Sequence, residues 1–100
     1  MSVPAPRSSE LVAAEILVTG MVQGVNYRAF TQHAAVELGL SGWVRNVPDG
    51  RVHVMVEGPR TKVQKLVSRL RVGPPHAVVT DLSVTWKAAT GEAFGFSVLP

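Results

Sequence analysis

The stretch EILVTGMVQGVNYRAF, residues 15–30, runs from an apolar segment through a glycine-containing loop into a helical pattern. The segment ILV at 16–18 is apolar on both faces, as expected for a central strand of a sheet. Gly20 and Gly24 follow before the helical pattern begins. A loop that leads into a helix N-terminus is a common anion site, because the first backbone N–H groups of the helix have no intrahelical partner. The stretch therefore predicts a strand, an anion-binding loop and a helix.

The helix that follows this loop is predicted to run from Tyr27 to Leu38. Its large apolar residues Tyr27, Phe30 and Leu38, with Ala34 between them, fall on one helical face. Gly39 stands where a residue in the left-handed conformation commonly ends a helix. The pattern favours a helix packed with one face on a core.

Two further segments, 41–47 and 51–58, are predicted to form a hairpin through the turn PDG at 48–50. In the second segment, valines alternate with polar or longer side chains, which indicates a strand with one buried face. A second helix is predicted after Pro59, since proline suits the first turn of a helix. Its expected inner stripe consists of Val63, Leu66, Val67 and Leu70.

The segment GPP at 73–75 ends the second helix, and two strands are expected after it. The first has alternating apolar residues, and the last is short, with Phe94 and Phe96 interpreted as core residues. The resulting order, β-α-β-β-α-β-β, predicts an α+β ferredoxin-like split-βαβ sandwich with both helices on one face of a mostly antiparallel sheet. We expect residues 1–10 to form a flexible tail and residues 11–100 to form a single domain.

Composition limits the classes of function that fit this chain. It has no cysteine, which excludes disulfides, thiolate catalysis and cysteine-based zinc sites. No apolar run approaches the roughly 20 residues of a membrane-spanning helix, and no signal peptide is recognisable. The net charge is +3, and the basic residues between 60 and 80 are interpreted as an exposed helix face, with binding of nucleic acid or acidic partners as the alternative. We expect a cytoplasmic monomer that binds neither membranes nor nucleic acid.

Arg28 stands in the first turn of the first predicted helix, where a positive charge opposes the helix dipole. No Asp or Glu occurs between Ile16 and Val36 to neutralise it. An anion bound at the same place would explain the arginine, since the guanidinium group and the backbone N–H groups of the loop suit a phosphoryl group. The donors expected to converge there are the N–H groups of Gly24, Val25, Asn26, Tyr27 and Arg28. A tight turn followed by a surface arginine remains the alternative.

Two familiar phosphate motifs do not fit this loop. A nucleotide P-loop needs Lys followed by Ser or Thr after its second glycine, whereas Val25 and Asn26 follow Gly24. A dinucleotide site needs a third glycine and an acidic residue at the end of a parallel strand, and neither is present. No Asp, Glu or His cluster at metal-ligand spacing accompanies the loop. The ligand predicted from these residues is a simple phosphate or a related ester, bound without a metal or cofactor.

The segments GMVQGVNYR, 20–28, and GWVRNVPDGRVHVMVEGP, 42–59, together resemble the two signatures of the acylphosphatase family. The resemblance spans about residues 15–98. It implies a small hydrolase that cleaves acyl phosphates to a carboxylate and inorganic phosphate without metal or cofactor. By this resemblance, Arg28 matches the arginine that holds the phosphoryl group, and Asn46 matches the asparagine that positions the attacking water. The backbone amides from Gly24 to Arg28 match the phosphate cradle.

The chemistry of acyl phosphates suits so sparse a site. The leaving carboxylate is a weak base, with a parent acid of pKa about 4 to 5, so no general acid is needed to protonate it. Two other readings stay open: an acylphosphatase-like N-terminal module of hydrogenase maturation factors, and a non-catalytic module that binds anions or nucleic acid. The histidines His33, His53 and His76 are dispersed along the chain and are interpreted as surface or packing residues.

Overall fold

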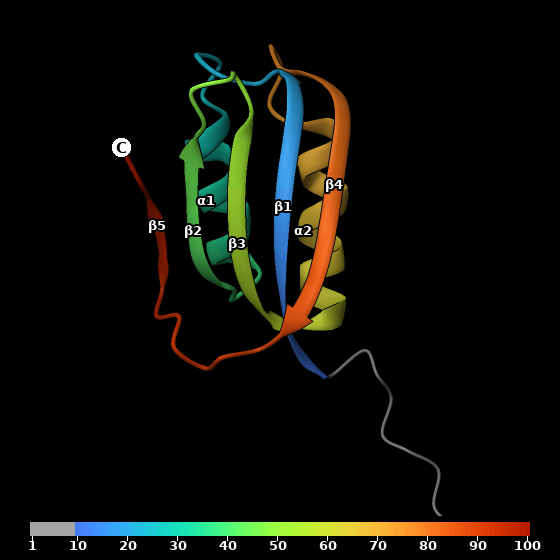
Figure 1. Cartoon of the computed structure of the whole chain (residues 1–100), viewed down its shortest axis with the longest axis vertical. Helices are drawn as coiled ribbons and strands as arrows, with labels where there is room; N and C mark the ends of the chain where they lie inside the picture. Colours follow the sequence, from blue (N-terminus) through green and yellow to red (C-terminus); the bar gives the residue numbers. More distant parts are fainter. Residues whose placement is uncertain (1–9) are drawn as a thin grey trace, which may run out of the picture.

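The computed structural model describes residues 10–100, which form a five-stranded sheet with two helices on one face (Figure 1). The predicted tail lies outside the described residues except for Glu10, so this division of the chain stays a prediction. The order of the elements is the predicted one. They are β1 (Leu11–Met21), α1 (Tyr27–Glu37), β2 (Ser41–Asn46), β3 (Val52–Pro59), α2 (Arg60–Val72), β4 (Val78–Ala88) and β5 (Phe96–Val98).

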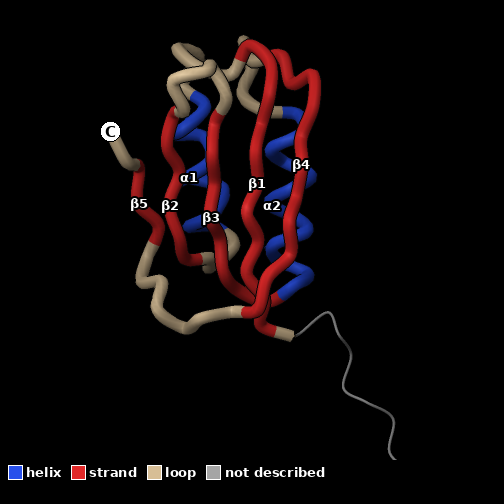
Figure 2. Tube along the Cα trace, in the orientation of Figure 1, coloured by secondary structure: helices blue, strands red, loops and turns tan. Residues whose placement is uncertain are grey.

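The strands lie in the order β4-β1-β3-β2-β5, and both helices cover the same face of the sheet (Figure 2). All neighbouring strands are antiparallel except β2 and β5, which are parallel. Val52 of β3 is paired with Val18 on one side and with Asn46 on the other. The register therefore brings the end of β1 and the end of β2 to the same edge of the sheet, beside the loop that enters α1.

The core lies between the helices and the sheet. β1 and β3 contribute alternate residues to it, and α2 contributes Val63, Leu66 and Leu70 from its predicted stripe, with Val67 partly buried. Helix α1 ends as predicted, because Gly39 has φ 70° and the N–H groups of Gly39 and Leu40 donate to the carbonyl oxygens of Val36 and Ala35. The side chains buried on α1 are Tyr27, Thr31, Ala34 and Ala35.

The core assignment of Phe94 is wrong. Its side chain is 99% exposed, whereas Phe96 is buried. Strand β5 pairs with β2 only over Phe96–Val98, so Phe94 precedes the ladder. Gly95, with φ 67°, turns the chain between the two phenylalanines, and the alternation of buried and exposed residues begins only after this turn.

Gly42 marks a place where the backbones of β2 and β3 approach too closely for a side chain. A Cβ atom at this position would overlap the carbonyl oxygen of Met55. Gly20 meets the carbonyl oxygen of Val78 in the same way, where the register of β1 and β4 shifts. In the described part of the chain, no helix is long and apolar enough to cross a membrane.

Candidate active site

The loop between β1 and α1 turns through two residues with left-handed backbone conformation. Gly24 has φ 75°, and Asn26 has φ 68° and ψ 23° at the N-cap position of α1. The N–H of Phe30 donates to the carbonyl oxygen of Asn26 over 3.1 Å, which forms the first turn of α1. Within residues 10–100, no protein acceptor meets the backbone N–H groups of residues 24–28. The loop therefore presents a row of free donors at the positive end of a helix.

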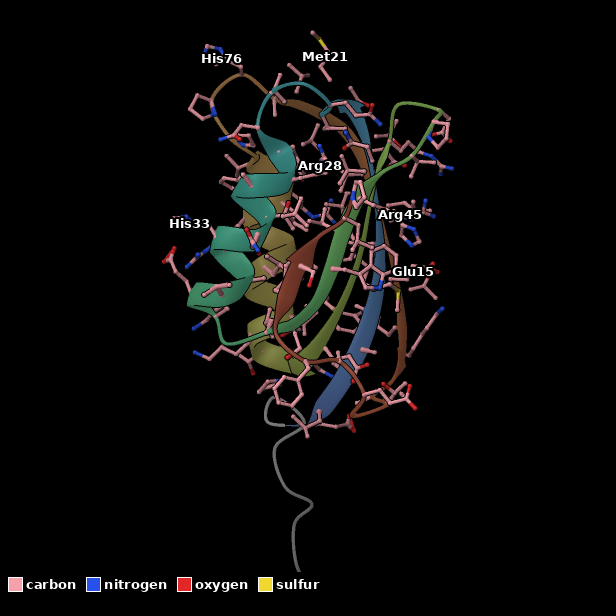
Figure 3. The ribbon with its side chains drawn as sticks, turned by 90° about the vertical axis from the view of Figure 1, so that its left-hand side faces the viewer. Glu15, Met21, Arg28, His33, Arg45 and His76 are labelled. Atoms are coloured by element: carbon pink, nitrogen blue, oxygen red, sulfur yellow. The ribbon has the colours of Figure 1, made fainter. Side chains whose placement is uncertain are left out.

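Arg28 lies in the first turn of α1, and Figure 3 shows it on the side of the helix that faces the strands. Its Nη1 donates to the carbonyl oxygen of Leu99 over 2.6 Å. Leu99 is held in turn by its N–H, which donates to the carbonyl oxygen of Val44 over 2.8 Å. The first turn of α1 contains no acidic residue. The guanidinium group is thus oriented by a neutral partner and keeps its full charge and further N–H donors.

Asn46, the last residue of β2, lines the same hollow as Arg28. Its Oδ1 is buried and has no hydrogen-bond partner among the described residues. The pocket that both residues share has a volume of about 320 Å³ and is lined by Val22, Gly24, Asn26, Tyr27, Arg28, Ala29, Asn46 and Val98. We call it the phosphate pocket, after the ligand that the sequence predicts. It contains all the expected site residues except Val25, which packs against the core.

Gln23 connects the loop to the turn that follows Asn46, a role that the sequence analysis missed. Its Nε2 donates to the carbonyl oxygens of Val47 and Arg51 over 2.7 and 2.9 Å. These two residues also pair with each other, because Val47 N donates to Arg51 O over 2.8 Å. The signature of the family contains Gln23, but its partners follow only from the fold. The same holds for the contact between Arg28 and Leu99, which no sequence signal indicates.

The titratable groups with shifted pKa values lie outside the direct contacts of Arg28 and Asn46, apart from Tyr27. Burial raises the pKa of Tyr27, whose hydroxyl donates to the carbonyl oxygen of Leu70 over 2.6 Å. His53 lies on the other face of the sheet, where its Nε2 is 2.8 Å from Glu15 Oε2. His33 and His76 are exposed, so the three histidines do not converge on one site. The buried hydroxyl of Tyr27 therefore connects α1 to α2 and, among the described residues, has no hydrogen bond to the rest of the pocket.

Comparison with known proteins shows the family of this chain. The family model of acylphosphatase matches residues 14–98. The chain belongs to the acylphosphatase family. It is 48% identical to the acylphosphatase of Roseiflexus sp. (strain RS-1) over 90 residues, which are 90% of this chain and 97% of that protein. It is 54% identical to the acylphosphatase of Methylococcus capsulatus over 84% of this chain and 91% of the relative.

Solved acylphosphatase structures have the same architecture. The crystal structure of acylphosphatase from Bacillus subtilis superposes with a TM-score of 0.86 at 39% identity, over 89% of this chain and 99% of that one. HypF from T. kodakarensis also matches, with a TM-score of 0.78 at 28% identity, but only over 12% of its own length. These similarities identify the chain as a ferredoxin-like acylphosphatase, a hydrolase that acts on a small-molecule substrate.

Proposed function

We propose that this acylphosphatase hydrolyses acyl phosphates by in-line attack of a water molecule on phosphorus. The backbone N–H groups of residues 24–28 and the guanidinium group of Arg28 bind the phosphoryl group, and Asn46 orients the water. One observation supports this assignment above all: Arg28 and the buried, unpartnered Oδ1 of Asn46 line the same pocket. All of these groups come from one chain, so the proposed unit of activity is a monomer.

The donors of the phosphate pocket suit a transition state in which negative charge is spread over the phosphoryl oxygens. Catalysis of phosphoryl transfer consists largely of positioning and charge stabilisation. The left-handed conformations of Gly24 and Asn26 suit a concave row of N–H groups that binds an anion, and Arg28 adds a charged fork of donors. Because Leu99 already orients the guanidinium group, little reorganisation is needed when the phosphoryl group binds.

Asn46 suits the task of holding water. A buried acceptor without a partner costs about 1–3 kcal/mol, and a water that donates to Oδ1 offsets this cost. The amide is too weak a base to take a proton from that water. We therefore assign the proton to a phosphate oxygen of the substrate. In this step the water oxygen bonds to phosphorus, the bond to the acyl oxygen breaks, and the carboxylate leaves with the electron pair.

The substrate class follows from the catalytic groups that each kind of leaving group requires. A carboxylate leaves without protonation, whereas an alkoxide requires a general acid or a metal ion. None of the side chains assigned to the phosphate pocket is placed as a general acid, because the Tyr27 hydroxyl donates to Leu70 and a guanidinium group does not serve as a proton donor to a leaving group in proteins. This chemistry favours acyl phosphates over alkyl phosphate esters.

The test is hydrolysis of benzoyl phosphate in excess chelator. We expect turnover to survive the chelator, inorganic phosphate to compete with the substrate, and Arg28→Ala to abolish measurable turnover in a folded protein. Arg71→Ala, which removes an exposed arginine of α2, is the control and should retain activity. Absence of hydrolysis by the folded wild-type protein would reject the proposal, and loss of turnover in chelator would reject its metal-free form.

A further inference from the structure

A second hollow adjoins the phosphate pocket on the other side of α1. It has a volume of about 460 Å³ and lies between α1 and the chain that follows α2. We call it the helix groove; it is lined by Asn26, Ala29, Phe30, His33, Ala34, Glu37, Arg69, Pro74 and Pro75. Asn26 and Ala29 line both hollows, so the groove begins at the phosphate pocket.

The walls of the helix groove are largely apolar and are fixed relative to each other. Phe30 and the small residues of α1 form one wall, and Pro74 and Pro75 form the other. The hydroxyl of Tyr27 ties the first turn of α1 to the carbonyl oxygen of Leu70 near the end of α2 over 2.6 Å. A proline wall loses little conformational freedom on binding, since its φ angle is already fixed. The groove is therefore formed before any ligand arrives.

The position of the groove suits the leaving group of an in-line reaction. Asn46 and Val98 form the strand side of the phosphate pocket, whereas Asn26 and Ala29 form the side shared with the groove. Figure 3 shows Arg28 and His33 on opposite sides of α1, with Arg28 toward the strands. Attacking and leaving oxygens lie roughly in line through phosphorus. A water held by Asn46 attacks phosphorus from the strand side. The leaving acyl group therefore lies on the opposite side of phosphorus, toward the groove.

We propose that the helix groove is the binding site for the acyl group and selects acyl phosphates with an apolar body of several carbon atoms. This proposal rests on the proposed function. With a rise of about 1.5 Å per residue, Phe30 lies about 6 Å and His33 about 10 Å along the helix from Asn26. An extended six-carbon acyl chain is long enough to reach Phe30, whereas an acetyl group ends beside Ala29. The ion pair of Arg69 and Glu37, 3.5 Å apart, closes the far end of the groove.

The experiment compares kcat/KM for hexanoyl phosphate and acetyl phosphate, which release carboxylates of similar basicity. Each fully buried CH₂ is worth on the order of a fourfold change in affinity, and the open groove buries the chain only in part. We expect the wild-type enzyme to favour hexanoyl phosphate by about tenfold, through a lower KM.

Two variants test whether the groove causes this preference. His33→Asp puts a carboxylate on an exposed position of the groove, and Phe30→Ala removes part of its apolar wall. In both, we expect the ratio of the two kcat/KM values to fall below about threefold. An effect of the added charge on phosphoryl binding changes both kcat/KM values by the same factor and leaves their ratio unchanged. Val36→Asp adds the same charge to α1 outside the groove, at a side chain that is 61% exposed. This variant should keep the wild-type ratio.

Each outcome has one meaning. A wild-type ratio near one, or a ratio that His33→Asp and Val36→Asp lower equally, overturns the acyl site while leaving the hydrolysis of both substrates intact. Hydrolysis of neither substrate by the folded wild-type protein refutes the proposed function instead. His33→Asp alters only an exposed side chain, so it decides the question even if Phe30→Ala fails to fold.

Discussion

Gln23 donates from its Nε2 to the carbonyl oxygen of Val47 over 2.7 Å, which joins the loop between β1 and α1 to the residue that follows Asn46. A second bond from the same nitrogen reaches Arg51 over 2.9 Å. The loop that we propose binds the phosphoryl group and the strand end that we propose orients the water are thus connected by one side chain. Their relative position depends on it.

We therefore predict that Gln23→Ala lowers kcat by at least tenfold, while the inhibition constant of inorganic phosphate changes by less than threefold. The reason is that the loop keeps its own backbone conformation, but its distance from Asn46 is no longer fixed. Loss of a donor to two partly buried carbonyl oxygens should also lower the free energy of unfolding by about 1–3 kcal/mol. Urea denaturation and steady-state kinetics measure the two effects. Gln64→Ala, on the exposed face of α2, is the control, and an unchanged kcat in Gln23→Ala would contradict the positioning role.

The buried hydroxyl of Tyr27 should contribute to stability. Tyr27→Phe leaves the carbonyl oxygen of Leu70 without this donor, and we expect the free energy of unfolding to fall by about 1–2 kcal/mol. Urea denaturation measures this loss. Because burial raises the pKa of Tyr27, the loss should be constant from neutral to mildly alkaline pH. A difference that disappears as the pH rises through that range would show that the hydroxyl titrates and would refute this assignment.

The close approach of β2 and β3 makes Gly42 sensitive to substitution. Gly42→Ala should lower the free energy of unfolding by about 3 kcal/mol or more, because the new methyl group overlaps the carbonyl oxygen of Met55. Gly91→Ala is a matched control, since Gly91 has φ 72° but no atom within 4 Å of the added Cβ. It should cost only about 1 kcal/mol. Equal losses in the two variants would show that backbone conformation alone, and not the contact with Met55, determines the cost.

The sheet face opposite the helices has a carboxylate whose ionisation should affect stability. The hydrogen bond with His53, and next the charge of Lys87, hold the pKa of Glu15 below its ordinary value of 4.5. A carboxylate with a lowered pKa in the folded state stabilises the protein above its unfolded pKa, and this contribution is lost as the pH falls through the folded pKa. Glu15→Gln should therefore flatten the acid side of the stability profile below about pH 4.5. The exposed variant Glu92→Gln should not, and identical profiles for wild type and Glu15→Gln would disprove the coupling.

Much of the fold was predictable because local signals and the global packing agree. The alternating valines of β3, the apolar stripe of α2 and Gly39 at the end of α1 each specify a local structure that the fold retains. Phe94 shows the limit of such patterns. Alternation of apolar residues does not reveal where a strand begins pairing, and Gly95 turns the chain just before the first ladder residue.

The sequence predicts the residues of the candidate site but not the contacts that support them. Arg28 and Asn46 belong to two sequence signatures, and the pairing of Asn46 with Val52 brings them to the same edge of the sheet. The bonds from Gln23 to the turn and from Arg28 to Leu99 join residues 24 to 71 positions apart. Such contacts follow from strand order and register, which no local spacing encodes. The helix groove was missed for the same reason, since α1 and the Pro74 segment form it together.

The role of Asn46 is the central claim, and the kinetics of Asn46→Ala with benzoyl phosphate test it most directly. We predict that kcat falls at least 100-fold, which is about 3 kcal/mol of transition-state stabilisation. The inhibition constant of inorganic phosphate should stay within about twofold, because the loop and Arg28 still bind the phosphoryl group. Retained turnover in the folded variant, or loss of phosphate binding together with turnover, would contradict the assignment of Asn46 to the attacking water.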